Sequence, residues 1–98
     1  MAKERNLRGL IPGGVDVAVT STVIVPANNS RRVLIVVNGS DTDMYFAVGQ
    51  DAVALAGLYV KANGGTLVLD EADFYSTQAV NGVHSGTGTK RATFQEFI

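Results

Sequence analysis

One stretch of the sequence decides the expected fold: Arg31-Arg32-Val33-Leu34-Ile35-Val36-Val37-Asn38-Gly39-Ser40. Its two arginines precede five consecutive apolar residues, four of which are β-branched, and an Asn-Gly-Ser turn follows them. Such a run is too short for a typical helix, and β-branched side chains disfavour one. A short apolar run between turn signals is typical of a strand buried on both faces. We therefore expect residues 33–37 to form the central strand of a small β-sandwich.

The segments on either side of this stretch also carry strand signals. Valines at positions 15, 17, 19, 23 and 25 alternate with other residues, which predicts a first strand with one valine face over residues 15–25. Asn63-Gly64-Gly65 is a tight-turn sequence, so residues 58–61 and 66–69 are expected to pair as a hairpin. Asn81-Gly82 is interpreted as the turn that ends a strand over residues 74–80. Other strands are expected at residues 44–48 and 90–98, while residues 51–58 fit either one helical turn or an irregular loop.

Seven to eight short antiparallel strands at this spacing predict an all-β fold. We expect a single small β-sandwich, or a jelly roll with different strand connectivity, over residues 15–98. Residues 1–14 are expected to form a flexible N-terminal arm, because Pro12-Gly13-Gly14 breaks regular structure at its end.

Composition narrows the classes of partner. The chain has 98 residues, 46% hydrophobic and 17% charged, whereas an average soluble domain has about 25% charged residues. This low charge content predicts that part of the surface is covered by another copy of the chain. Eight basic residues against nine acidic ones argue against nucleic acid as a partner. The absence of a long apolar run argues against a membrane, and the charged opening residues do not resemble a signal peptide, so we expect synthesis in the cytosol.

No residue pattern points to catalysis, a metal or a cofactor. His84 is the only histidine and there is no cysteine, so a transition-metal site lacks ligands and His84 is interpreted as a loop residue. Asp41, Asp43 and the acidic residues at 70–73 are interpreted as solvated turn acids rather than a calcium site. We therefore expect no enzymatic activity, no metal site and no cofactor.

Two ends of the chain are candidates for partner contact. The arm offers arginines that can pair with acidic groups, and apolar side chains that can fill a groove. Adjacent residues of a strand point to opposite faces, so one of Phe97 and Ile98 should face away from the core. A disordered tail is the alternative interpretation of the arm. The predicted contact residues are Arg5, Leu7, Arg8, Leu10, Ile11, Phe97 and Ile98.

The aromatic side chains leave a second possibility open. Most of them should pack inside a core of this size, but three could form a stacking platform for a sugar or for nucleic-acid bases. The five concerned are Tyr45, Phe46, Tyr59, Phe74 and Tyr75.

The order of these motifs resembles the small β-sandwich structural proteins of tailed bacteriophages. The resemblance covers residues 15–97 and rests on turn and core signals. It is carried by Thr20-Ser21-Thr22, Ile24-Val25-Pro26-Ala27-Asn28-Asn29-Ser30-Arg31-Arg32, Leu34-Ile35-Val36-Val37-Asn38-Gly39-Ser40, Met44-Tyr45-Phe46-Ala47-Val48-Gly49, Gly64-Gly65-Thr66-Leu67-Val68-Leu69 and Val80-Asn81-Gly82-Val83-His84-Ser85-Gly86-Thr87-Gly88.

This resemblance implies a non-enzymatic virion protein. Members of the group are capsid decoration (cement) proteins, fibre or tail modules, and other virion components. The chain departs from the fibre version because it has no long shaft and no second domain. The resemblance therefore implies a location on the capsid surface, the major capsid protein as partner, and a homo-oligomer, a trimer rather than a dimer. The alternative is a tail- or fibre-associated protein, or a carbohydrate-binding attachment module of the virion.

Overall fold

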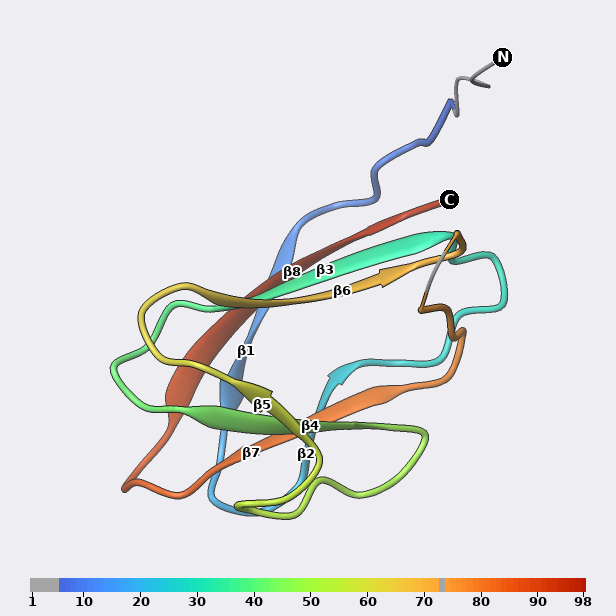
Figure 1. The fold of residues 1–98 in the computed structure, drawn as a ribbon. Helices are drawn as coiled ribbons and strands as arrows, with labels where there is room; N and C mark the ends of the chain where they lie inside the picture. The colour runs from blue at the N-terminus through green and yellow to red at the C-terminus, as the bar shows by residue number, and fades with distance from the viewer. Residues whose placement is uncertain (1–5, 73) are drawn as a thin grey trace.

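The computed structural model describes residues 6–72 and 74–98 as a sandwich of two four-stranded antiparallel sheets (Figure 1). The first, here called the β3 sheet, has the order β1-β8-β3-β6, and the second, the β7 sheet, has the order β2-β7-β4-β5. This confirms the predicted all-β fold. The strands are β1 (Gly13–Val17), β2 (Thr22–Val25), β3 (Val33–Asn38), β4 (Met44–Val48), β5 (Leu58–Val60), β6 (Gly65–Asp70), β7 (Val80–His84) and β8 (Lys90–Phe97). No helix long and apolar enough to cross a membrane occurs among the described residues.

The apolar run at residues 33–37 forms an inner strand, as predicted. β3 pairs with β6 on one side and with β8 on the other. Leu34 and Val36 are fully buried between the two sheets, whereas Ile35 and Val37 are only half-buried on the outer face. The prediction of burial on both faces was therefore wrong, because the second sheet covers only one face of this strand.

The predicted first strand is two strands. β1 belongs to the β3 sheet and β2 to the β7 sheet, and residues 18–21 cross from one to the other. Thr22 Oγ1 accepts a hydrogen bond from the Ala18 backbone N–H at 3.1 Å and donates one to the Thr20 carbonyl at 3.0 Å. These local bonds bend the chain and end the valine alternation. Val19 and Val23 are consequently exposed rather than on the core face.

The predicted hairpin is a corner between the sheets. β5 and β6 flank Asn63-Gly64-Gly65 but belong to different sheets, so they do not pair. Asn63 and Gly64 have φ angles of 62° and 112°, and their backbone N–H groups donate at 2.8 Å to the carbonyls of Ser40 and Asn38. The turn signal was correct, but these long-range bonds direct the chain into the other sheet.

The last third of the sequence contains a further correction. Residues 74–79 form no strand, and Asn81-Gly82 lies inside β7 instead of ending a strand. Gly82 is a packing glycine, because an added Cβ would lie 2.5 Å from Ile24 Cδ1 and 2.9 Å from the ring of Phe46. Residues 51–57 are an irregular loop, the second of the two alternatives.

Candidate partner-binding face

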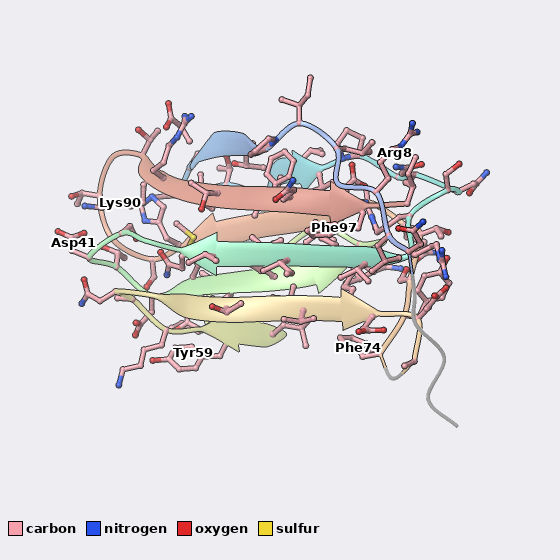
Figure 2. The ribbon with its side chains drawn as sticks, turned by 90° about the horizontal axis from the view of Figure 1, so that it is seen from above. Arg8, Asp41, Tyr59, Phe74, Lys90 and Phe97 are labelled. Atoms are coloured by element: carbon pink, nitrogen blue, oxygen red, sulfur yellow. The ribbon has the colours of Figure 1, made fainter. Side chains whose placement is uncertain are left out.

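The outer face of the β3 sheet carries a groove of about 490 Å³. Figure 2 looks onto this face, with β8 and β3 in its middle. The groove, here called the outer groove, lies between these strands and the segment that leads into β1. Its lining residues are Pro12, Gly13, Gly14, Ile35, Val37, Arg91, Thr93, Phe94, Gln95 and Phe97.

Strand register places apolar and polar side chains together on this face. Directly paired residues of an antiparallel sheet point to the same side. Val37 pairs with Thr93, Ile35 with Gln95, and Val33 with Phe97. The outer groove therefore has a mainly apolar floor with two polar side chains that can hydrogen-bond to a partner.

At one end of the outer groove, Arg91 is held by an exposed ion pair. Its Nη1 atom lies 3.1 Å from Asp16 Oδ1, across the β1–β8 pair. Both side chains are more than half exposed. Such a pair contributes little to stability, so Arg91 can change partner at low cost.

Part of the predicted arm pairs with the domain's own last strand. The Arg8 backbone N–H donates to the Ile98 carbonyl at 2.7 Å, and the Ile98 N–H donates to the Arg8 carbonyl at 2.9 Å. The Leu10 N–H donates to the Glu96 carbonyl at 2.9 Å. Gln95 Nε2 also donates to the Leu10 carbonyl at 2.9 Å. Residues 8–10 thus continue the edge of the β3 sheet beyond β1 (Figure 1).

The structure brings most of the predicted contact residues to one place. Ile11 is 89% exposed, although it lies one residue after the paired segment. Phe97 lines the outer groove, and Gly9 forms a bridge with it. The remaining described residues fall into two classes: Arg8 is exposed, whereas Leu7, Leu10 and Ile98 are half-buried. Arg5 lies outside the described residues.

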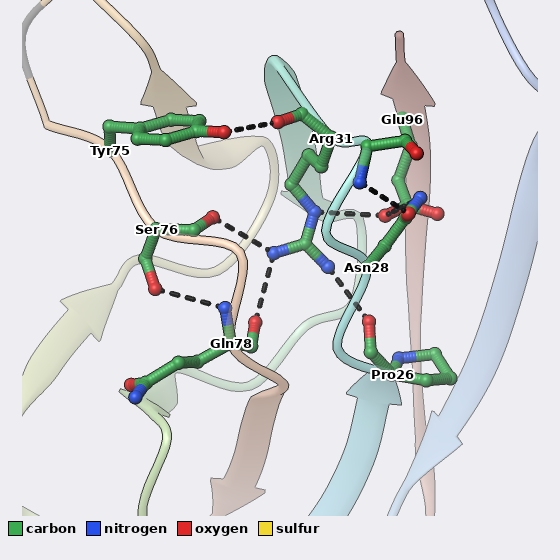
Figure 3. Close-up of polar contacts among 8 residues, drawn as sticks. Pro26, Asn28, Arg31, Tyr75, Ser76, Gln78 and Glu96 are labelled. Atoms are coloured by element: carbon green, nitrogen blue, oxygen red, sulfur yellow. Dashed lines mark hydrogen bonds and ion pairs between the residues drawn. The ribbon is translucent and has the colours of Figure 1, made fainter.

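A buried arginine fixes the strand end that carries this surface (Figure 3). Arg31 is fully buried, and its Nε atom donates to Glu96 Oε2 at 2.8 Å. Its Nη1 donates to the carbonyls of Ser76 and Gln78 at 3.1 and 2.9 Å, and its Nη2 donates to the Pro26 carbonyl at 2.8 Å. The guanidinium therefore ties β8 to the loops that follow β2 and precede β7.

Two further bonds complete this cluster. Asn28 Nδ2 donates to the same Glu96 oxygen at 3.3 Å, and the Tyr75 hydroxyl donates to the Arg31 carbonyl at 2.6 Å. Glu96 is adjacent to Phe97, so the cluster holds the end of β8 in place. No sequence motif signalled it, because its partners are mainly backbone carbonyls far along the chain.

His84 ends β7 and is buried, so its interpretation as a loop residue was wrong. Its Nδ1 accepts the Gly86 backbone N–H at 3.1 Å, and its Nε2 lies 2.8 Å from the Gly88 carbonyl. Both ring nitrogens therefore organise the glycine-rich loop that follows. Across residues 6–72 and 74–98, no three His, Cys, Asp or Glu side chains gather as a metal site would require.

The β7 sheet carries an aromatic pair, in which Tyr59 is exposed and Tyr45 is half-buried. The ring centroids of Tyr45 and Tyr59 are 5.6 Å apart and the rings are tilted by 40°. The Tyr59 hydroxyl donates to Asp43 Oδ2 at 2.8 Å. This hydrogen bond raises the pKa of Tyr59, while the Ala62 N–H and then the Tyr59 hydroxyl lower the pKa of Asp43. Asp43 thus has a structural role in orienting the exposed ring.

Comparisons with known proteins do not identify the chain. No family model matches the sequence, and neither the curated proteins nor the solved structures include a significant match. The fold, the outer groove and the chain ends are therefore the basis for the functional argument.

Proposed function

We propose that this protein is a non-enzymatic structural component of a tailed-bacteriophage virion, a capsid decoration protein that binds the outer capsid surface and stabilises the particle as a homo-oligomer. The observation that supports this most is the convergence of both chain ends with the outer groove. The outer groove lies next to residues 8–11 and to the end of β8, which carries Phe97 and Ile98. The resemblance of residues 15–97 to phage sandwich proteins supplies the identity of the partner, the major capsid protein.

The geometry suits binding to a surface better than chemistry on a small molecule. The outer groove is open and its floor is mainly apolar. Ile11 beside it is almost fully exposed, and burying such a side chain against a partner stabilises the complex by about 1.5–3 kcal/mol. Residues 8–10 are already ordered by their pairing with β8, so less conformational entropy is lost on binding.

Replacing Ile11 with aspartate tests this proposal. We expect an unchanged melting temperature, because Ile11 is 89% exposed, and at least tenfold weaker binding to purified capsids, which corresponds to about 1.4 kcal/mol. Co-sedimentation with undecorated capsids measures the binding. Val53→Asp is the matched control, since Val53 is also apolar and exposed but lies in the loop after β4. If both variants bind capsids equally well, the arm does not contribute to the contact with the capsid.

Deleting residues 1–12 would be a less selective test. The deletion removes the backbone hydrogen bonds that residues 8 and 10 make with β8. We expect it to lower stability as well as capsid binding, whereas the point variant separates the two effects.

The alternative function is carbohydrate binding by an attachment module, which the Tyr45–Tyr59 pair favours. If a sugar stacks on the exposed ring of Tyr59, removing that ring should weaken sugar binding by about 1–3 kcal/mol, by analogy with base stacking. Under the alternative, a glycan array probed with the parent should give signals that Tyr59→Ala abolishes. Under the capsid-decoration proposal, we expect no glycan signal from the parent and normal capsid binding by Tyr59→Ala.

A further inference from the structure

The two sheets have four edge strands, and three of them are protected against pairing with another chain. β5 has only three residues. β2 contains a register shift between Val23 and Val25, and Pro26 follows it. β1 follows Pro12 and carries the charged Asp16 on its outer face. Short length, bulges, prolines and charges are the features that prevent edge-to-edge association.

β6 has neither a bulge nor a proline, and its only charged residue is Asp70 at its end. Its six residues, Gly65–Asp70, pair with β3 at six successive positions without a register shift. The strand contains no proline and no lysine, and Val68 on its outer face is 45% exposed. An exposed, regular and apolar edge of this kind is a template for strand addition.

Backbone directions identify the groups at this edge. The Glu71 N–H donates to the Arg32 carbonyl at 3.1 Å, on the side of β3. The Asp70 N–H donates to the Phe74 carbonyl at 2.8 Å, on the opposite side. Because these directions alternate along an antiparallel strand, the N–H and C=O groups of Thr66 and Val68 point away from β3. No strand in the described part of the chain pairs with β6 on that side.

Charged side chains of both signs lie at the ends of this edge. Phe74, whose carbonyl accepts the Asp70 N–H, is 49% exposed at one end of β6, whereas the exposed ring of Tyr59 belongs to β5 in the other sheet. Lys61 is exposed at the Gly65 end, where its carbonyl accepts the Gly65 N–H at 3.0 Å. The other end carries Asp70 and Glu71, and Glu71 is ion-paired with Arg32 at 2.9 Å.

We propose that β6 pairs antiparallel with β6 of a second copy, about a two-fold axis at Leu67. In this register Thr66 of each copy lies opposite Val68 of the other. Four backbone hydrogen bonds then form between the edge groups, and the β3 sheets become continuous. The exposed N–H and C=O groups of Thr66 and Val68 are self-complementary about Leu67, which favours a second copy as the occupant.

This inference does not depend on the virion role, and it departs from the trimer that the resemblance implied. A two-fold contact of this type uses the same surface on both copies, so it closes as a dimer. The outer groove lies between β8 and β3 and the segment before β1, on the other side of β3 from the β6 edge. The dimer would therefore leave the proposed capsid-binding surface accessible on both copies.

The test measures molar mass by light scattering and sedimentation across micromolar concentrations. We expect the parent to reach twice the chain mass of 10.3 kDa. Val68→Lys adds a charge at the edge, and Val68→Pro removes an N–H that β3 does not use. Both variants should be monomers with the parent's circular dichroism spectrum. Val23→Lys, at a similarly exposed position on the edge strand β2, is the control and should remain a dimer.

Three results would overturn the proposal. If the unmodified protein stays monomeric at every concentration, the β6–β6 contact does not form. If the unmodified protein has the mass of a trimer, the copies associate through a contact other than a two-fold β6–β6 pair. A folded Val68→Lys variant that keeps the dimeric mass would show that the copies associate elsewhere.

Discussion

Replacing Leu34 with aspartate should leave the chain unfolded at room temperature. Leu34 is fully buried between the sheets on the inner strand β3. A carboxylate there would have neither water nor a cationic partner, and burying it costs at least several kcal/mol. The total stability of a small domain is about 5–15 kcal/mol, so the variant should lose its cooperative thermal transition when followed by circular dichroism.

The neighbouring substitution Ile35→Asp is the control for this result. Ile35 is half-buried and faces the outer groove, where an added carboxylate stays in contact with water. We expect a folded protein that is less stable by about 1–2 kcal/mol. If Ile35→Asp unfolded the domain and Leu34→Asp did not, the register of β3 would be shifted by one residue, because such a shift exchanges the two faces.

Replacing Arg31 with methionine should produce the second-largest loss of stability. The substitution removes the ion pair with Glu96 and the hydrogen bonds to the carbonyls of Pro26, Ser76 and Gln78. It leaves the mostly buried Glu96 carboxylate with only Asn28 as a donor, and it leaves three partly buried carbonyls without the guanidinium. Breaking one partner of a buried ion pair costs about 3–5 kcal/mol. Urea denaturation of the purified variant gives the change in the free energy of unfolding.

The adjacent Arg32 provides a matched control. Arg32 Nη2 lies 2.9 Å from Glu71 Oε1, but both side chains are partly exposed. Arg32→Met should therefore cost about 0–1 kcal/mol. Equal effects of the two substitutions would show that the Arg31 cluster does not hold β8 to its neighbouring loops.

The sequence was sufficient to predict the strands that local signals define. The apolar run at residues 33–37 and the strand at 44–48 both appear where they were expected. Local signals did not predict the course of the chain where contacts between residues distant in sequence determine it. The alternation of valines continues through residues 15–25, but the bonds around Thr22 divide it between the two sheets. Asn63-Gly64-Gly65 signals a turn equally well whether the next strand returns to the same sheet or enters the other.

The candidate site shows the same division. The sequence predicted that one of Phe97 and Ile98 faces away from the core, because neighbouring residues on a strand point to opposite sides, but it did not say which; the structure places Phe97 in the outer groove. Ile35, Val37 and Thr93, which line the same groove, could not be predicted from the sequence. The register between β3 and β8 joins residues about 60 positions apart. The exposed edge of β6 was likewise invisible while residues 58–61 and 66–69 were expected to pair with each other.

Cryo-electron microscopy of the intact virion tests the proposed role most directly. The account predicts β-sandwich density of about the chain's 10.3 kDa mass on the outer capsid surface, with the outer groove, residues 8–11 and the end of β8 against the major capsid protein. Density for this domain only in the tail or fibres, or a capsid contact made by the opposite β7 sheet, would contradict it.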